Sequence, residues 1–517
     1  MEKTQHQVAR AALLVMAAFA VSRALGFVRQ IVFGLYFGTG LEMDAYVAAL
    51  RVPDALFLIV AGGALGSAFI PTFTTRLAQE DEAGAWRLAS AISNLLLIVL
   101  VPLSAAAMAL SPWLVRTVVA PAADPAIQAR AADLMRVMLL SPAIFGVSGI
   151  VMGALNAHQH FLLPAVAPLL YNIAIIAGAI WGGISGTGTM GAAVGMVVGA
   201  LLHLLVQVPG LLRYGARYTP ALGLRDPGVR EVGTLMAPRV LGVAVVQINM
   251  VITTRLASAL GGGAISALDY AWRLMLLPQG IFAQAVGTAV FPTFSAQAAR
   301  GELDAMRHTL LTMLRTLVAL MLPATAGMIV LGRPLVALVF ERGAFSATST
   351  ADVSMALALF SLGLVGHSLI EIFARAFYAL HDTWTPAIAA MGSMAVNLLL
   401  GLALPSLFTR AGLAAHGGLA LANALAALIE MVVLLWVMQR KIGGLALRSA
   451  FGQAARAALA SVGMAFLVLL WLRLAPSELL LQSVGGIVIG GLSYLLFAWL
   501  LRIEELRMAA AMVLHRR

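Results

Sequence analysis

The sequence predicts an all-α polytopic membrane protein with about fourteen transmembrane helices, arranged as two pseudo-symmetric six-helix halves followed by two further helices. Three observations lead to this prediction. Of 517 residues, 61% are hydrophobic and 11% are charged, which is too little polar surface for a soluble chain of this size. The apolar residues gather in runs of about 20 or more, which is the length that crosses a bilayer. Two stretches 225 positions apart also read alike.

The apolar runs are separated by turn residues or charges. The first run follows Lys3 and Arg10, so it could be taken for a secretion signal. It continues past the length of such a signal and carries an arginine where cleavage would be expected, so we interpret it as an uncleaved helix. The predicted spans are 10–37, 44–73, 88–112, 130–155, 162–183, 189–212, 232–258, 265–294, 308–332, 352–380, 384–407, 414–439, 450–473 and 479–501.

The net charge of +11 is explained by membrane topology. Most Lys and Arg residues between the predicted spans fall on the side of the N-terminus, as expected when that side is cytoplasmic. An even number of helices then places both termini in the cytoplasm. Nucleic acid is therefore not an expected partner. The chain has no cysteine, which excludes disulfides and thiolate metal sites.

An internal duplication divides the chain. Residues from Asp44 to Gly62 match residues 225 positions later, and after a gap of four residues Pro71-Thr72-Phe73 matches Pro292-Thr293-Phe294. A second pair lies further along: "ALNAHQHFLLPAVAP" from Ala154 matches "ALHDTWTPAIAA" from Ala379. Chance similarity between Ala/Leu/Gly-rich helices is the alternative. Parallel repeats of this kind are typical of secondary transporters, whose substrate site lies between the halves. We predict one lobe at 1–218, a second at 219–443 and two appended helices at 444–517. The residues that match at a constant offset of 225 are Asp44, Pro53, Phe57 and Gly62 with Asp269, Pro278, Phe282 and Gly287.

Several arginines fall within predicted spans, and four of them lie in the first, second and eighth spans, which are matching elements of the two halves or adjacent to them: Arg23, Arg29, Arg51 and Arg273. An arginine at bilayer depth costs roughly 2.5–3.5 kcal/mol on insertion scales, so such residues usually face a cavity or a partner. Arginine keeps its charge, and its planar fork matches phosphate bidentately. The sequence therefore predicts a cationic cavity for a phosphate-bearing substrate.

The alternative is that these side chains reach the membrane surface or pair locally. Arg51 has Asp54 three residues further along the same helix, where an ion pair can form. Arg23 and Arg29 are six residues apart, which is about 9 Å along a helix and roughly 120° around it. A bend at Gly26 would turn both toward one ligand.

Weaker polar features could form a cation or proton site. Oxygen ligands suit a hard cation such as Na⁺. The alternatives are an ion pair between Glu371 and Arg375 and a loop cap at Asp382. The candidates for ion coupling are Gln247, Asn249, Asp382 and Asn397, with Glu371 and Glu430 as further possibilities.

Enzyme chemistry has no sequence support. The "GTGTMG" at Gly186 fits a dinucleotide-binding pattern, but no strand precedes it, so we interpret it as a turn. No Walker A sequence, nucleophile elbow or metal-ligand cluster occurs. We expect a transporter without nucleotide hydrolysis and without a cofactor, driven by Na⁺ or by the membrane potential.

Several stretches together resemble a known family. They are "SRALGFVRQ", "MDAYVAALRVPDALFLIVAGGALGSAFIPTF", "GALNAHQHFLLPAVAPLLYN", "YAWRLMLLPQGIFAQAVGTAVFPTFS" and "FYALHDTWTP". The chain resembles the MurJ (MviN) family of lipid II flippases, within the multidrug/oligosaccharidyl-lipid/polysaccharide exporter superfamily, along nearly its whole length. The resemblance implies alternating access in the bacterial cytoplasmic membrane and export of the undecaprenyl-pyrophosphate-linked disaccharide-pentapeptide for peptidoglycan synthesis. Bilayer lipids and cell-wall synthesis proteins are further expected partners.

The resemblance also assigns roles to residues. It implies a cationic cavity that holds the pyrophosphate and a groove along the last two helices that holds the lipid tail. The predicted substrate-binding residues are Ser22, Arg23, Arg29, Asp44, Arg51 and Arg273. Of these, Arg51 does not match a residue of the family motif. It is assigned because it lies six residues before Phe57, where the family pattern has a charged residue.

This chain departs from the better-studied family pattern. That pattern has charged residues where Phe57, Gly62 and Leu276 stand, and an aspartate where Gln30 follows Arg29. Arg51 lies six residues before Phe57 and can partly replace the missing charge of the second helix. The competing hypotheses are a flippase for another lipid-linked oligosaccharide, a cation-coupled drug exporter, and a non-transporting scaffold for cell-wall enzymes.

Overall fold

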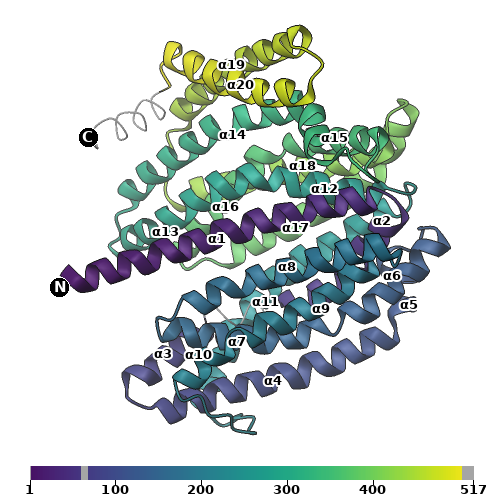
Figure 1. Ribbon diagram of the computed structural model, residues 1–517. Helices are drawn as coiled ribbons and strands as arrows, with labels where there is room; N and C mark the ends of the chain where they lie inside the picture. Colours follow the sequence, from purple (N-terminus) through teal and green to yellow (C-terminus); the bar gives the residue numbers. More distant parts are fainter. Residues whose placement is uncertain (1, 60–67, 504–517) are drawn as a thin grey trace. The chain divides into compact units, whose positions relative to one another are not determined.

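The computed structural model describes residues 2–59 and 68–503, and every regular element in that part of the chain is a helix. Figure 1 shows the helices along the chain. They separate into two compact units. Unit 1 comprises residues 1–266 and 342–345, and unit 2 comprises residues 267–341 and 346–517. Each unit is described by itself.

Unit 1 contains the helices up to α11. The π-helical turn η3 (Val115–Val119) follows α5 directly. The remaining bounds are α1 (Glu2–Phe37), α2 (Leu41–Phe57), α3 (Ile70–Ala78), α4 (Glu82–Ala109), α5 (Ser111–Leu114), α6 (Pro125–Met138), α7 (Ser141–Ala157), α8 (Leu162–Ser185), α9 (Met190–Leu205), α10 (Val208–Arg213) and α11 (Pro227–Ala257).

Unit 2 contains the later helices, and α12 begins three residues before the unit does. A π-helical turn, η4 (Gln279–Ala283), separates α12 from α13. The remaining bounds are α12 (Ala264–Pro278), α13 (Gln284–Ala299), α14 (Leu303–Phe340), α15 (Ala347–Ser361), α16 (Leu364–Ala379), α17 (Trp384–Arg410), α18 (Ala415–Lys441), α19 (Leu447–Leu474) and α20 (Leu479–Leu500).

Within the described residues, each of the fourteen predicted spans coincides with a helix or with helices in consecutive pieces. Among the described residues, ten helices are long and apolar enough to cross a membrane, and α15 with α16 forms an eleventh span bent by 47°. The other three predicted spans correspond to α1, to α2 with α3, and to α11. The all-α membrane fold predicted from the sequence is confirmed, although several spans are segmented.

Two of the segment breaks occur beside residues with special packing or bonding. Between α15 and α16, a Cβ on Gly363 would lie 2.7 Å from the Cα of Ala424 in α18, so only glycine permits this approach. Between α9 and α10, Pro209 lacks the N–H that would continue the helix. The backbone N–H of Gln207 bonds to the carbonyl of Leu204, and the carbonyl of His203 instead accepts a hydrogen bond from Nε2 of Gln207 at 2.7 Å.

Both duplicated stretches contain π-helical residues after the shared proline. In the first, Leu58 and Ile59 are π-helical, five and six residues after Pro53, whereas in the second η4 begins at Gln279, directly after Pro278. At the offset of 225, the two segments coincide only at Leu58 and Ala283 among the described residues. The predicted match at Gly62 falls outside the described residues.

The predicted boundary between the repeats and the boundary between the two compact units differ by one helix, α11. The predicted second lobe begins at 219, whereas unit 1 continues to Ser266 and so includes α11. Hydrogen bonds explain this grouping: Arg76 pairs with Asp226 at the start of α11, and Arg255 near its end donates to the carbonyl of Val118. The predicted lobe boundaries concern the repeat and stay a prediction.

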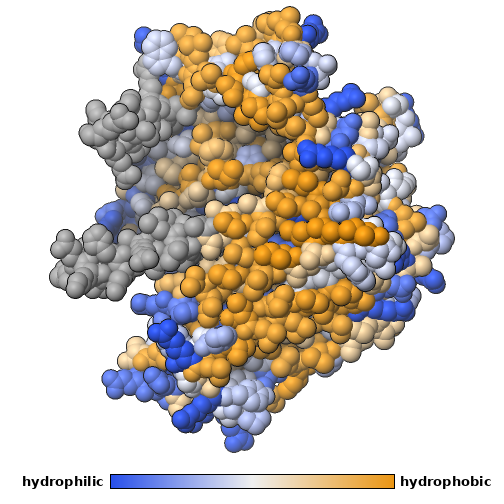
Figure 2. Space-filling model, viewed as in Figure 1, coloured by the Kyte–Doolittle hydropathy of each residue, from blue (hydrophilic) through white to orange (hydrophobic). Residues whose placement is uncertain are grey.

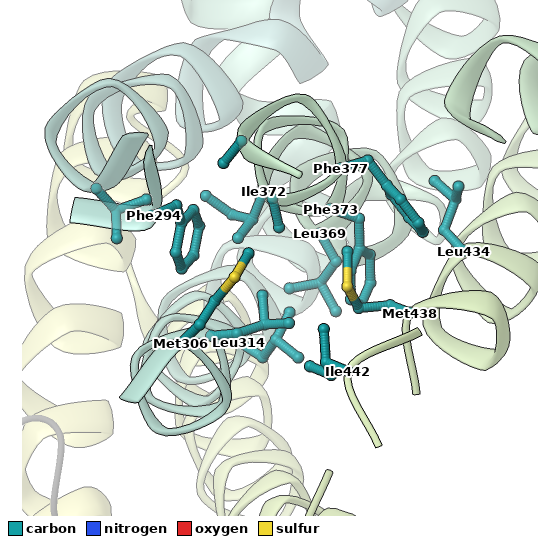
Figure 3. Close-up of a cluster of buried hydrophobic side chains, with 14 of the residues drawn as sticks. Phe294, Met306, Leu314, Leu369, Ile372, Phe373, Phe377, Leu434, Met438 and Ile442 are labelled. Carbon is teal, nitrogen blue, oxygen red and sulfur yellow. The ribbon is translucent and has the colours of Figure 1, made fainter. Parts of the chain in front are cut away.

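Apolar side chains fill each unit and also cover its outside. In unit 2, side chains from α13, α14, α16 and α18 form a buried cluster (Figure 3) that includes Phe294, Met306 and Phe373. Figure 2 shows hydrophobic residues over α8 and α9. On α8, Trp181 is 55% and Ile184 is 75% exposed. Apolar exposure on this scale is what a lipid environment requires.

Candidate substrate-binding site

The first helix carries three of the predicted binding residues. Ser22 is partly buried, Arg23 is exposed, and Arg29 is partly buried. The Nε of Arg29 is buried and has no hydrogen-bond partner among the described residues. Because a buried guanidinium N–H is costly to leave unpaired, Arg29 is the residue of α1 that most requires a ligand oxygen.

Gly26 lies between the two arginines. Helix α1 continues through it without interruption, and a Cβ placed there would meet no described heavy atom within 4 Å. Packing therefore does not require glycine at this position. The predicted bend at Gly26 stays a prediction, and glycine's flexibility is the remaining reason for its presence.

Asp44 is placed as a helix cap. Its side chain is buried, and its two oxygens accept hydrogen bonds from the backbone N–H groups of Gly263 at 2.6 Å and Ser266 at 2.7 Å. These two residues flank the start of α12 (Ala264–Pro278), where a carboxylate also meets the positive end of the helix dipole. Asp44 therefore joins the start of α2 to the start of α12, and its substrate role stays a prediction.

Arg51 lies on the face of α2 that meets α11. Its Nε donates to Oγ1 of Thr254 at 2.8 Å, and Thr254 is 3% exposed. The two residues are 203 positions apart in the chain. The structure thus holds Arg51 by a partner on another helix, in addition to any local pairing with Asp54.

Arg273 lies in unit 2, one helical turn after Asp269. Its Nε is 2.5 Å from a carboxylate oxygen of Asp269, whose side chain is 5% exposed, while the Arg273 side chain is 36% exposed. The buried carboxylate fixes one edge of the guanidinium, and the rest of this side chain reaches the surface of the unit.

The ion-coupling candidates do not form a single cluster. Gln247 is 9% exposed and lines a cavity, but Asn249 is two residues away and points to a different side of α11. Asn397 is buried in α17, roughly 22 Å along the helix from the level of Asp382. Among the described residues, no group of three His, Cys, Asp or Glu could hold a metal ion.

Asp382 acts as a cap and an ion-pair partner, as the alternative interpretation has it. Its carboxylate accepts hydrogen bonds from the backbone N–H of Thr385 at 3.0 Å and from Oγ1 of Thr385 at 2.7 Å, and pairs with Lys441. Burial raises the pKa of Asp382, but these hydrogen bonds and the Lys441 charge outweigh burial and hold the pKa below its usual value. Glu371 likewise pairs with Arg375 at 2.9 Å.

Two of the residues that replace charged residues of the family pattern, Phe57 and Leu276, are apolar side chains within the described part of the chain. Phe57 packs against Phe145 of α7, with ring centroids 5.2 Å apart, and contacts the core of unit 1. Leu276 is 36% exposed on α12. Gly62 lies outside the described residues. The surroundings of Phe57 thus accommodate an aromatic ring and no charged group. Arg51 is the basic residue that α2 carries.

Thr254 was not among the predicted site residues. The available signal was the spacing of seven and four between the polar residues Gln247, Thr254 and Ser258, which places them on one helical face; the structure shows that all three are buried. An apolar helix with one buried polar stripe indicates a packed partner or a cavity on that side.

A family model described as "Lipid II flippase MurJ" matches residues 33–485. The chain belongs to the lipid II flippase MurJ family. A protein of Burkholderia cenocepacia named lipid II flippase MurJ is 32% identical over 83% of this chain and 84% of its own length. A probable lipid II flippase MurJ of Vibrio cholerae is 29% identical over 97% of this chain and 98% of its own.

Solved structures agree with the MurJ assignment. A lipid II flippase MurJ in an inward closed conformation is 26% identical, with a TM-score of 0.79 and coverage of 94% of this chain and 98% of the other. An inward-facing MATE family transporter of the MOP superfamily has a TM-score of 0.68 at 15% identity, covering 83% and 98%. The MATE likeness concerns the fold alone. The resemblance predicted from the sequence is confirmed at the level of the family.

Proposed function

We propose that this MurJ-family chain moves lipid II from the inner to the outer leaflet of the bacterial cytoplasmic membrane by alternating access. The observation that carries the proposal is the family match, which extends over residues 33–485. The substrate named for the family carries a diphosphate, and fixed guanidinium groups recognise phosphate oxygens bidentately. We propose Arg23, Arg29, Arg51 and Arg273 as the diphosphate-recognising residues.

Complementation tests this proposal. We expect the wild type to restore growth of a strain depleted of its own lipid II flippase, and Arg23→Ala and Arg273→Ala to fail at wild-type protein levels. Arg136→Ala is the matched control, because Arg136 forms an exposed ion pair with Asp133 at 2.9 Å. Lipid II accumulating in the inner leaflet on depletion supports the proposal, and unchanged lipid II topology contradicts it. A flippase for another lipid-linked oligosaccharide would give the second outcome.

We propose further that the membrane potential resets the cycle without nucleotide hydrolysis. Permanent positive charges in the membrane respond to voltage by about 2.3 kcal/mol per elementary charge per 100 mV. The Na⁺ alternative would use Gln247, Asn249, Asp382 and Asn397, but the oxygens of Asp382 are engaged by Thr385 and Lys441. In proteoliposomes, a K⁺ diffusion potential should change the flipping rate, whereas replacing Na⁺ by choline should not. The opposite pattern would favour Na⁺ coupling.

A further inference from the structure

One hydrogen bond ties an intramembrane arginine to a buried threonine. In unit 1, Nε of Arg51 on α2 donates to Oγ1 of Thr254 on α11 at 2.8 Å. The Thr254 hydroxyl in turn donates to the backbone carbonyl of Met250 at 2.9 Å. Because its single proton is used on that carbonyl, the oxygen faces Arg51 as an acceptor. The direction of the bond is therefore fixed.

The contact also fixes how the guanidinium can meet an anion. A guanidinium offers its donors in a rigid planar fork. With Nε directed at Thr254, an approaching phosphate is met through the two terminal nitrogens. A side chain already held in one orientation loses less conformational freedom on binding than a mobile one, which raises affinity.

A cavity lies next to the hydrogen-bonded pair of Arg51 and Thr254. Helices α2 and α11 run antiparallel there, so the positions one and two turns from Arg51 and Thr254 are Ala55 with Val251 and Ile59 with Gln247. These residues line a cavity of about 390 Å³. The cavity begins one helical turn from Arg51, and Arg51 itself is only partly buried, so this residue is not sealed into the packing between α2 and α11.

We propose that Thr254 is a positioning residue that orients Arg51 for the diphosphate of a polyprenyl-linked substrate. This rests on the proposed function, and it gives Arg51 the role of the charge missing at Phe57. Thr254 acts through Arg51 and does not touch the substrate. The rival explanation is that the hydrogen bond only fastens α11 to α2.

Isosteric variants separate the two explanations. Thr254→Val keeps the shape and removes the acceptor, Thr254→Ser keeps the acceptor, and Thr253→Val is the matched control because its hydroxyl donates to the Asn249 carbonyl at 2.9 Å. With purified protein, farnesyl diphosphate and lipid II serve as probes and farnesol as the diphosphate-free control. We expect Thr254→Val to bind both diphosphates about tenfold more weakly, which is about 1.4 kcal/mol. Thr254→Ser and Thr253→Val should bind as the wild type does.

A double-mutant cycle with Arg51→Gln tests the route of action. If Thr254 acts through Arg51, Thr254→Val has no further effect on affinity in the Arg51→Gln background, while farnesol binding stays unchanged throughout. Equal losses in both backgrounds, or a lowered melting temperature with unchanged affinity, would overturn the inference and leave a fastening role.

The proposed function is judged separately. If the wild type binds neither diphosphate and Arg273→Ala changes nothing, the proposed function fails. If the wild type binds and Arg273→Ala weakens binding, but Thr254→Val and Arg51→Gln do not, the positioning role alone is wrong.

Discussion

Asp44 illustrates how an intramembrane acidic residue can be structural. Its two oxygens each accept a backbone N–H, from Gly263 and Ser266. An asparagine side chain has one oxygen, so it can accept a hydrogen bond from only one of these two N–H groups. Its NH₂ group then faces the other N–H, and Asp44→Asn leaves two buried donors facing each other. We expect an apparent loss of stability on the order of 1–3 kcal/mol, measured as a lower melting temperature in detergent. Asp133→Asn, in an exposed pair, should melt as the wild type does.

A wild-type melting temperature for Asp44→Asn, together with lost lipid II binding, would instead assign Asp44 to the substrate. The two outcomes are distinct because the predicted substrate role and the observed cap require different readouts. The same distinction applies to every residue transferred from a family motif: the motif fixes the residue type and leaves open which contact it serves.

At the scale of single elements, the break between α9 and α10 depends on a side chain. Nε2 of Gln207 contacts the carbonyl of His203 at 2.7 Å and Oγ of Ser148 at 3.0 Å, and that hydroxyl meets Nδ1 of His203 at 2.7 Å. Gln207→Leu removes the side-chain donor from the carbonyl of His203, whose usual backbone donor, the N–H of Gln207, bonds to Leu204 instead. We expect a destabilisation of about 1–3 kcal/mol, read as a lower melting temperature. Gln79→Leu, in an exposed turn with an ordinary backbone conformation, is the control, and equal melting temperatures in Gln207→Leu and the wild type would contradict the prediction.

Gly26 gives an element-scale prediction about motion. An alanine there meets no described atom within 4 Å, and it favours a helix interior by about 1 kcal/mol over glycine. If α1 must bend at Gly26 to bring Arg23 and Arg29 to one ligand, Gly26→Ala should keep or raise the melting temperature and lower the flipping rate. Gly233→Ala, on α11 with equally open space, is the matched control.

An unchanged flipping rate in Gly26→Ala would show that α1 works without a bend at this residue. A lowered melting temperature would show instead that the glycine serves packing, against the open space around it. Both readouts come from the same purified protein, so the stability and the transport effects can be compared directly.

At the scale of the molecule, periodicity and composition predicted which segments are helices and missed where they break. Fourteen apolar runs are enough to define the class, because lipid requires helices whose backbone groups are satisfied internally. The bend at Gly363 could not be predicted, because it depends on the approach of Ala424 from another helix. The contact of Arg51 with Thr254, 203 residues away, was missed for the same reason: the sequence marks polar faces and does not say which faces meet.

In each unit, an aspartate outside the predicted spans forms an ion pair with a basic residue from another helix. These pairs predict that the melting temperature depends on pH. In unit 1 Asp226 pairs with Arg76, and in unit 2 Asp382 pairs with Lys441. Burial raises the pKa of Asp226, but the hydrogen bond and charge of Arg76 outweigh it, so that the pKa is lowered, as it is for Asp382. A carboxyl whose pKa is lower in the folded than in the unfolded state stabilises the fold above the unfolded value of about 3.9.

That stabilisation is lost as the pH falls through the lowered folded pKa. We therefore expect the melting temperature to be insensitive to these two groups between about pH 5 and 7 and to fall below about pH 4. Arg76→Gln and Lys441→Gln should each lower the melting temperature at neutral pH and flatten the decline on acidification, because the pKa of the partner carboxyl returns toward its unfolded value. Arg136→Gln, in an exposed pair, should leave the profile unchanged. A decline of equal steepness in Arg76→Gln and the wild type would mean that Asp226 draws its low pKa from the backbone N–H of Gly228 and not from the arginine.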